Sequence, residues 1–392
     1  MRLPPRPSLS AASAGLVLLS LLLACGDEAP AAVTAPPTPT TPSPETVCDG
    51  AKRLVLPDDF SARGPWAVGA RTVQVGGLTS EIWYPAEAST ALGKDTVTYD
   101  IRKQLPPDEM GKISDEKNPL QACACVRDLP LDEAHGPYPV VVFFHGTAAF
   151  RTQSVAQMTH WASRGFVVVA TDHPMLYLAD ALKGDIAFDG PFPANSGLVL
   201  DAIKGSEEPV RFLSGHVDFD KIASSGHSAG GAAAARWSYP GTKVKMPLSA
   251  GGTEVAPGLV STLVMGGDQD KLVPATQQKK GFDASPTKKR LVLLKGAGHL
   301  AFSDICSLGR ENGGILQIAL DAGVRVPKFL TALAVDGCAD GQLFGERADR
   351  VVNAITAATL EETLACGAGA EAALRNIGGA YPAEIAGYEE GL

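Results

Sequence analysis

A serine at the centre of a Gly-x-Ser-x-Gly pentapeptide is the residue whose surroundings most strongly suggest chemistry. The pentapeptide spans residues 226–230, with Ser228 at its centre. Residues 222–225 are typical of a buried strand, and the alanine-rich residues 231–237 are typical of a helix. Strand, tight turn and helix in this order predict a nucleophile elbow, which raises the serine hydroxyl above the sheet. An ordinary glycine-rich turn would also fit the pentapeptide, so the partners of Ser228 must decide.

A serine nucleophile needs a base and an orienting acid, and both follow further strand patterns. Residues 261–267 precede Asp270, and residues 290–294 lead into a Gly-Ala-Gly-His turn that ends at His299. We expect Ser228 to attack the substrate. His299 would take its proton and return it to the leaving group, and the aspartate would fix the imidazole. The order Ser, Asp, His along the chain is that of α/β-hydrolases.

Other aspartates compete for the role of the acid. Asp270 lies deeper in its loop than Asp268, which could be a solvated turn residue. Asp304 lies five residues after His299 and is the weaker rival. We therefore assign the orienting role to Asp270.

Backbone donors for an oxyanion are expected at two turns. Residues 139–144 form an uninterrupted apolar run that predicts a strand buried on both faces, and the chain continues into a His-Gly-Thr turn. The loop after this strand and the residue after the nucleophile supply the oxyanion hole in α/β-hydrolases. Those residues are Thr147 and Ala229.

The remaining histidines do not point to a metal site. His145 and His227 flank the oxyanion and nucleophile turns and are expected to bond the backbone, whereas His173 could line the substrate cleft. The sequence contains no His-Glu-x-x-His motif, zinc-type Cys/His spacing or calcium loop, so we expect neither a metal nor a cofactor. The other three are expected to be solvated or to serve in packing: His135, His160 and His216.

Two stretches resemble a known branch of the α/β-hydrolases. Residues 138–151 and 163–174 look like those of platelet-activating factor acetylhydrolases and of bacterial PET hydrolases of the cutinase type, and the similarity extends over about residues 65–305. The resemblance implies an α/β-hydrolase fold with a mostly parallel central sheet flanked by helices. It also implies a serine-dependent carboxylic ester hydrolase. By the same resemblance the triad is Ser228, Asp270 and His299, and the oxyanion hole is Thr147 and Ala229.

One departure from the branch concerns polyesters. The polyester hydrolases place an aromatic residue in the loop after the sixth strand and another at the oxyanion position. Here residues 247–253 contain no aromatic side chain, and the oxyanion position is Thr147. This departure argues against polyester cleavage.

The N-terminal sequence predicts export and a lipid anchor. A basic start is followed by an apolar stretch at residues 15–23, which is too short to span a bilayer as a mature helix. The stretch ends in Leu-Leu-Ala-Cys, which resembles a lipobox. We expect residues 1–24 to be a lipoprotein signal peptide and Cys25 to be lipidated, which would place the protein at the bacterial cell envelope, on the outer membrane or the periplasmic face. An ordinary secretory signal is the alternative. The Pro/Thr-rich residues 25–47 are expected to be a tether.

Cysteine number fits an oxidising compartment. Without Cys25, six cysteines remain, which allows up to three disulfides. We expect Cys306 to pair with Cys338, because both flank the segment after the catalytic histidine. The closely spaced Cys123 and Cys125 do not have the spacing of a zinc site.

Composition leaves room for one catalytic domain, at residues 48–392. The chain has 392 residues and a net charge of −9, which argues against a nucleic-acid partner, and we expect a monomer. Residues 73–84 predict an opening hairpin, and residues 98–125 a surface excursion. After about residue 306 a helical elaboration is expected, with helices at 326–333 and 348–364 that pack against the sheet or form a lid.

These observations predict a serine ester hydrolase that forms an acyl-enzyme on short or medium acyl esters or on acetylated lipids. The alternatives within enzymes are a lipase, a phospholipid acylhydrolase tethered to a membrane, or a polyester hydrolase. The alternative of another class is a catalytically silent binding protein with the hydrolase fold. Such proteins typically lose the serine or the histidine, and this chain has both.

Overall fold

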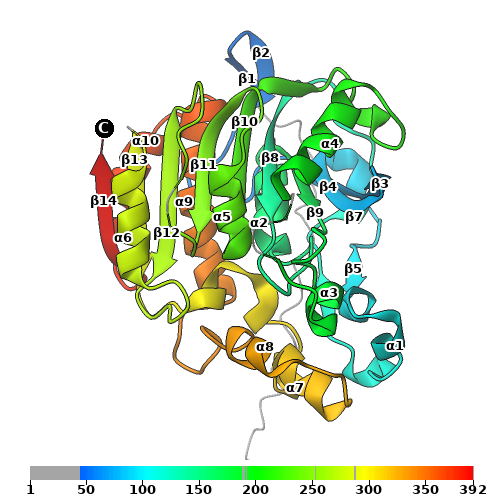
Figure 1. Cartoon of the computed structure of the whole chain (residues 1–392). Coiled ribbons are helices and arrows are strands. Elements are labelled where there is room, and N and C mark those ends of the chain that lie inside the picture. The colour runs from blue at the N-terminus through cyan, green and yellow to red at the C-terminus, as the bar shows by residue number, and fades with distance from the viewer. Residues whose placement is uncertain (1–44, 188–189, 191, 252, 287, 392) are drawn as a thin grey trace, which may run out of the picture. The chain divides into compact units, whose positions relative to one another are not determined.

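A ten-stranded sheet forms the centre of the computed structural model, which describes residues 45–187, 190, 192–251, 253–286 and 288–391 (Figure 1). The six strands β13, β12, β11, β10, β8 and β9 pair with one another in parallel. β14 pairs antiparallel with β13, and β4 pairs antiparallel with both β9 and β3. The order across the sheet is β14 (Ile385–Gly391), β13 (Lys289–Leu294), β12 (Ser261–Gly267), β11 (Thr242–Leu248), β10 (Val217–His227), β8 (Tyr138–Phe144), β9 (Val167–Thr171), β4 (Leu78–Ala86), β3 (Ala67–Val75) and β7 (Val126–Arg127).

The apolar run of β8 explains why this strand lies at the centre. Val140, Val142 and Phe144 face one hydrophobic cluster, and Val141 and Phe143 face the other. Successive side chains of a strand point to opposite faces, so a strand between two helical layers is apolar at every position. All seven residues of β8 are buried.

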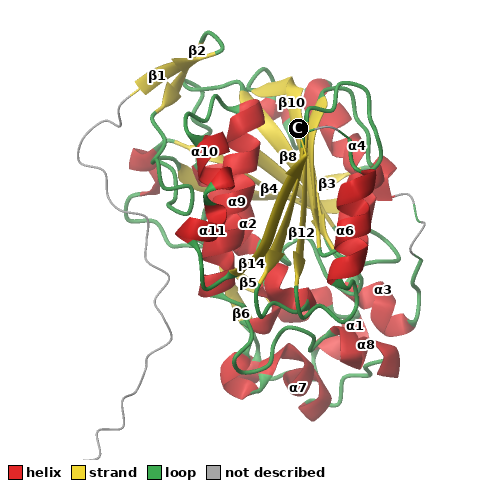
Figure 2. Ribbon diagram, turned by 90° about the vertical axis from the view of Figure 1, so that its left-hand side faces the viewer, coloured by secondary structure: helices red, strands yellow, loops and turns green. Residues whose placement is uncertain are grey.

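Helices cover both faces of the sheet (Figures 1 and 2). On one face α2 (Val155–Ser163) packs against α9 (Glu346–Leu364), and on the other lie α4 (Phe192–Lys204), α5 (Ala229–Arg236) and α6 (Ala275–Ala284). Two buried arginines bind α9: Arg164 pairs with Glu361, and Arg290 pairs with Glu362 at 2.8 Å. α9 therefore serves in packing, one of the two roles expected for residues 348–364.

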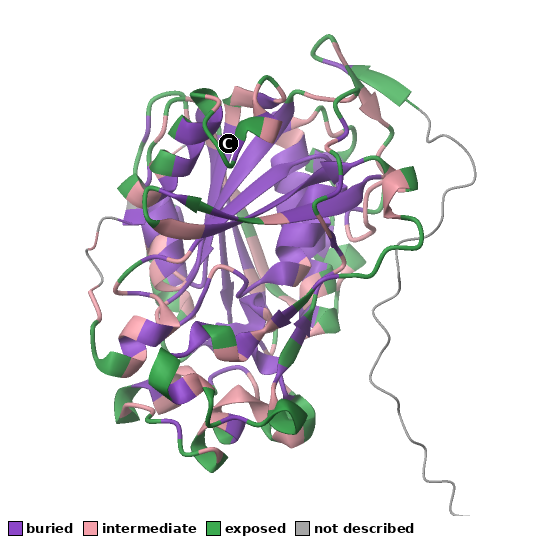
Figure 3. Ribbon diagram, turned by 90° about the vertical axis from the view of Figure 1, so that its right-hand side faces the viewer, coloured by how far each residue is buried: buried purple, intermediate pink, exposed green. Residues whose placement is uncertain are grey.

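Short helices gather beyond the carboxyl ends of the parallel strands (Figures 1 and 2). They are α1 (Pro107–Met110), α3 (Leu178–Lys183), α7 (Gly314–Asp321) and α8 (Lys328–Leu333). Figure 3 shows that the strands of the sheet are buried, whereas these helices carry exposed and half-exposed residues. Ligands of α/β sheets bind at this end.

The remaining elements are short. Two-stranded sheets are formed by β1 (Glu45–Cys48) with β2 (Ala51–Leu54), and by β5 (Thr98–Asp100) with β6 (Leu120–Ala122). Two helices, α10 (Ala370–Arg375) and α11 (Ile377–Ala380), precede β14. The 3₁₀ helices are Ala88–Ala91, Ile101–Gln104, Asp115–Lys117, Arg211–Leu213, His299–Phe302, Asp304–Cys306 and Arg310–Asn312.

The predicted α/β-hydrolase fold class is confirmed, including the C-terminal helices and the opening hairpin, which is β3 and β4. The antiparallel strand β14 was not expected. The signal peptide and Cys25 lie outside the described residues, as does all of the predicted tether except residues 45–47. Those three residues form strand β1 instead of a tether, because they pair with β2. No helix among the described residues is long and apolar enough to cross a membrane.

The part of the chain that the structure describes contains three disulfides. Cys306 bonds Cys338, as expected from the sequence, and the others are Cys48–Cys366 and Cys123–Cys125. The Cys306–Cys338 bridge encloses the segment that carries α7 and α8. Cys48 and Cys366 also lie near Asp49 in a group with metal-like spacing, but the disulfide occupies both sulfurs.

Candidate active site

Ser228 stands on a strained turn between β10 and α5. Its φ of 57° and ψ of −124° are unusual for a residue with a side chain. A Cβ atom on Gly226 would lie 2.4 Å from the Gly230 oxygen, and one on Gly230 would lie 2.1 Å from the Phe144 oxygen. The two glycines therefore allow the turn to press against β8, and Ser228 has the geometry of a nucleophile elbow.

His299 and Asp270 meet with a second serine. His299 Nδ1 lies 3.0 Å and 3.2 Å from the two carboxylate oxygens of Asp270. Ser249 Oγ donates a short hydrogen bond to Asp270 and lies 3.1 Å from His299 Nδ1. All three side chains are buried. They form a triad-like network.

The two nitrogens of His299 face different partners. Nδ1 is engaged by Asp270, whereas Nε2 has no hydrogen-bond partner among the described residues. His299 and Ser228 line the same pocket. An imidazole that donates from Nδ1 to a carboxylate keeps the Nε2 lone pair available as a base.

The carboxylate of Asp270 is held in its charged form. Burial acts to raise the pKa of Asp270, but hydrogen bonds from His299 and Ser249 and the backbone N–H of Val273 outweigh it, and the pKa is lowered. The N–H groups of Leu272 and Val273 donate to Oδ1 at 2.9 Å and 2.8 Å. Asp270 can therefore orient His299 without itself taking a proton.

Gln153 connects three loops of the site. Its Oε1 accepts a hydrogen bond from the backbone N–H of Gly146 at 2.7 Å, and its Nε2 lies 2.8 Å from His227 Nδ1. Because an amide nitrogen only donates, His227 Nδ1 accepts, and His227 Nε2 carries the proton. That nitrogen lies 2.8 Å from the backbone oxygen of His299 and donates to it. We call these residues, from Gly146 through Gln153 and His227 to His299, the Gln153 relay.

Burial keeps the relay neutral. Burial, together with the nearby His299, lowers the pKa of His227 to about 3. His145, next to Gly146, is also buried and its pKa is lowered by desolvation. His145 accepts from the backbone N–H of His173 at 3.0 Å and donates to the Gly146 oxygen at 2.8 Å. The expectation that His145 and His227 bond the backbone is confirmed.

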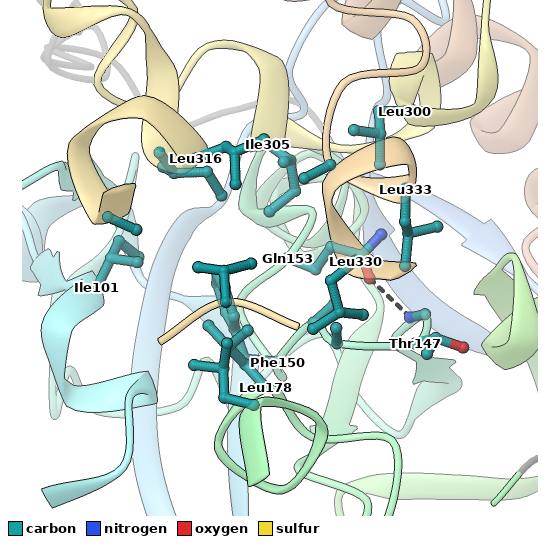
Figure 4. A pocket seen from close by; sticks show the side chains of 18 of the residues that line it. Ile101, Thr147, Phe150, Gln153, Leu178, Leu300, Ile305, Leu316, Leu330 and Leu333 are labelled. Atoms are coloured by element: carbon teal, nitrogen blue, oxygen red, sulfur yellow. Dashed lines mark hydrogen bonds between the residues drawn. The ribbon is translucent and has the colours of Figure 1, made fainter. Parts of the chain in front are cut away.

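The two residues predicted to form the oxyanion hole lie close to Ser228. Thr147 lines the same pocket as Ser228, and Ala229 is the first residue of α5, where backbone N–H groups point out of the helix. The N–H of Gly146 is occupied by Gln153, the bond drawn as a dashed line beside Thr147 in Figure 4. The next backbone N–H in the loop after β8 is that of Thr147, which is therefore the candidate donor to an oxyanion.

The rival aspartates lie in other surroundings. Asp268 is exposed and accepts a hydrogen bond from the N–H of Gly296 at 2.7 Å, as expected for a turn residue. Asp304 bonds Gln121 and the N–H of Ala156 at the start of α2. Burial raises the pKa of Asp304 to about 7. Neither aspartate bonds His299, so Asp270 is the acid of the network.

Of the other four histidines, three differ in part from expectation, and His160 serves in packing, as expected. His173 is fully buried and stacks on Phe144 at 5.3 Å, so it packs under the oxyanion loop and does not line the pocket. His135 is not solvated, because it is mostly buried against Asp132 at 2.7 Å. His160 is a buried packing residue and His216 is half-buried.

An apolar pocket opens above Ser228 (Figure 4). It encloses about 120 Å³, and most of its walls are aliphatic. The wall residues come from the excursion at residues 98–125, from α3 and from α7 and α8. The excursion was expected to be a surface feature, but Ile101 and Leu105 place it in the pocket wall. Helix α8 was expected either to pack on the sheet or to form a lid, and it covers the pocket.

The comparison with known families points the same way. Residues 116–175 match the family model of platelet-activating factor acetylhydrolase, isoform II. This match covers about one sixth of the chain and includes β8, the oxyanion loop, Gln153, α2 and β9. No curated protein matches the sequence. The match and the triad-like network agree with the α/β-hydrolase fold described above.

Sequence reasoning missed two residues of the site. Ser249 follows β11, and only the fold brings it to Asp270, from which it is 21 positions away in the chain. Gln153 lies in a Thr-Gln-Ser stretch seven residues after Gly146. The one sequence signal for Ser249 is its position directly after a strand, and the one for Gln153 is its position shortly before a helix. Many loop residues share these positions, so the signal is weak.

Proposed function

We propose that this chain is a serine-dependent carboxylic ester hydrolase in which Ser228 is the nucleophile, His299 the base and Asp270 the orienting acid. The observation that carries the proposal is the orientation of His299, which gives Nδ1 to Asp270 and has Nε2 free in a pocket shared with Ser228. Ser228 would attack the ester carbonyl, and the N–H groups of Thr147 and Ala229 would stabilise the oxyanion. His299 would then protonate the leaving alcohol, and water would release the acid.

Ser249 is the competing serine, and its position argues against a nucleophilic role. It shares the Nδ1 side of the imidazole with Asp270 and is fully buried. A nucleophile must lie on the Nε2 side and be open to the substrate. We assign Ser249 to holding the Asp270 carboxylate in place.

Covalent labelling by a fluorophosphonate separates these assignments. We expect Ser228→Ala to abolish labelling and to lower kcat on p-nitrophenyl butyrate by about four to six orders of magnitude. Ser249→Ala, the matched control, should remain labelled and lose about tenfold or less, because one hydrogen bond to Asp270 is lost. If Ser249→Ala abolishes labelling and Ser228→Ala does not, Ser249 is the nucleophile and the two assignments are exchanged. A folded protein that no probe labels would favour a silent binding protein.

We propose short or medium acyl esters as substrates, with acetylated lipids among them. The match to an acetylhydrolase family and the apolar pocket support this class. A lipase or phospholipid acylhydrolase is the alternative, which the same pocket favours. Micellar phospholipid and tributyrin, assayed beside the soluble esters, separate the two.

We also propose that the mature protein is a monomer held at the cell envelope by a lipid on Cys25. The lipobox-like sequence before Cys25 supports this placement. In a bacterial host, an alkyne fatty acid should label the full chain but not Cys25→Ser. Light scattering of the chain without its first 25 residues should give the monomer mass. Equal labelling of both chains would contradict the anchor.

A further inference from the structure

Two separate loops carry the acid and the base of the proposed triad. Asp270 lies in the loop after β12, and His299 lies in the loop after β13, which is the neighbouring strand. The loops bond each other just before these residues, where the N–H of Gln269 donates to the oxygen of Ala297 at 3.0 Å. What holds the chain after the acid and after the base therefore also bears on their alignment.

One residue far along the chain, Asp336, bonds both loops. Its carboxylate oxygen Oδ2 accepts a hydrogen bond from the N–H of Lys271 at 2.9 Å. Its backbone oxygen accepts one from the N–H of Leu300 at 2.8 Å. These two N–H groups belong to the residues that directly follow Asp270 and His299. A single residue thus binds the chain next to the acid and the chain next to the base.

The backbone around this residue lies close to the loop of the base. A Cβ atom on Gly298 would lie 2.5 Å from the Cα of Gly337, and one on Gly337 would lie 3.0 Å from the carbonyl carbon of Gly298. Gly337 has a φ of 104°, which residues with a side chain rarely adopt. Further along, the N–H of Leu343 donates to the oxygen of Gly296 at 2.9 Å. Residues 336–343 therefore lie against this loop, and we call them the strap.

The strap is firmly anchored at the place where it meets the loops. Asp336 is 8% exposed, so its bond to the N–H of Lys271 is shielded from water. A hydrogen bond to a carboxylate is stronger than one between neutral groups, and a low local dielectric strengthens it further. Two residues after Asp336, Cys338 forms a disulfide with Cys306 in the segment that follows the proposed base. The strap is thus attached by a covalent bond as well as by hydrogen bonds.

We propose that Asp336 is a positioning residue, which keeps the carboxylate of Asp270 and the imidazole of His299 in register by holding the N–H groups that follow them. This inference rests on the proposed ester hydrolysis. Asp336 lines a cavity behind the strap and not the pocket above Ser228, so it acts through the acid and the base and not on the substrate. Its loss should therefore lower kcat and change KM little.

Substitutions in the strap test this role. Asp336→Ala removes the acceptor of the Lys271 N–H, and we expect kcat on p-nitrophenyl butyrate to fall about 10- to 100-fold with KM within about threefold of the wild type. Asp336→Asn retains an oxygen that can accept from the same N–H, so it should restore kcat to within about fivefold. The matched control is Asp340→Ala, which removes an exposed carboxylate of the strap that pairs with Arg310. It should leave kcat within about twofold of the wild type.

A spectroscopic signature reports the alignment itself. The proton between His299 Nδ1 and Asp270 should give a downfield resonance in ¹H NMR, because it is shared with a carboxylate. We expect this resonance to broaden or to move upfield in Asp336→Ala, and to persist in Asp336→Asn and in Asp340→Ala. Urea unfolding of each variant gives the fraction that is folded under the conditions of the assay.

The outcomes separate the positioning role from the hydrolysis on which it rests. A folded Asp336→Ala variant with the kcat of the wild type would overturn the positioning role. A kcat that falls only in proportion to the unfolded fraction, with the resonance unchanged, would overturn it too and leave Asp336 a structural residue. If a fluorophosphonate does not label the wild type, the proposed hydrolase is refuted. A resonance that is lost in Asp336→Ala and kept in Asp336→Asn would still support the alignment by Asp336 in that case.

Discussion

Replacement of Gln153 by leucine tests whether the relay positions the catalytic loops. Leucine has a similar volume but can neither accept from Gly146 N–H nor donate to His227 Nδ1, so two buried polar groups lose their partner. Each such group costs about 1–3 kcal/mol, which gives a loss of about 2–6 kcal/mol in the free energy of unfolding.

The same substitution should also slow catalysis. Without Gln153, the loop that carries Thr147 and the ring of His227 that holds the His299 backbone are both less fixed. Loss of alignment by about 1 Å costs on the order of 100-fold in rate, so we expect kcat to fall about 10- to 100-fold with a smaller change in KM. The assay is hydrolysis of p-nitrophenyl butyrate at a temperature where urea unfolding shows the variant to be folded.

A matched control lies at the other end of α2. Ser163 is also fully buried and makes two hydrogen bonds, from Gly64 N–H at 3.1 Å and to the His160 oxygen at 2.7 Å, away from the site. Ser163→Ala should lower the stability and leave kcat unchanged. If Gln153→Leu lowers the stability but keeps the kcat of the wild type, the relay serves only in folding and our reasoning is wrong.

Three further changes probe the Cys306–Cys338 disulfide, a buried acid and the nucleophile elbow. The double variant Cys306→Ser with Cys338→Ser removes a disulfide between residues 32 positions apart in the chain. We expect the free energy of unfolding to fall by about 4 kcal/mol, and an unchanged Tm would refute this. Burial raises the pKa of Asp304 to about 7, so its contribution to stability is present below about pH 4 and is lost as the pH rises through 7. Asp304→Asn should therefore gain Tm relative to the wild type between pH 4 and 8, and a constant difference would contradict this. Gly230→Ala places a Cβ 2.1 Å from a backbone oxygen, so we expect fluorophosphonate labelling to be lost; a labelled, stable variant would show that the turn can relax.

The sequence was sufficient for the parts of the fold that depend on local pattern. Helices cover both faces of the sheet at β8 and β12, so every residue of these strands is buried. This burial requires uninterrupted apolar runs, which are visible in the sequence. The elbow glycines are required by a backbone approach that any side chain would block. The strands that precede the predicted turns are parallel, so these turns all lie at one end of the sheet.

Contacts between distant segments could not be predicted in the same way. The excursion has polar and charged residues and no regular period, yet Ile101 and Leu105 form the pocket wall because α7 covers them. Strand β14 contains Gly387 and two glutamates, a composition that does not predict a strand. It is a strand because it pairs with β13, which is distant in the sequence. Arg290 is buried in β13 because Glu362 of α9, a distant part of the chain, provides its counter-charge.

The relay has a consequence for the charge balance of turnover. The rings of His227 and His299 lie with their centroids 4.7 Å apart. When His299 accepts the proton of Ser228 in the proposed mechanism, a second imidazolium at this distance would repel it and weaken the base. Because the pKa of His227 is about 3, this neighbour stays uncharged throughout the neutral and mildly acidic range. A second imidazole can thus hold the backbone of the proposed base without adding a positive charge beside it.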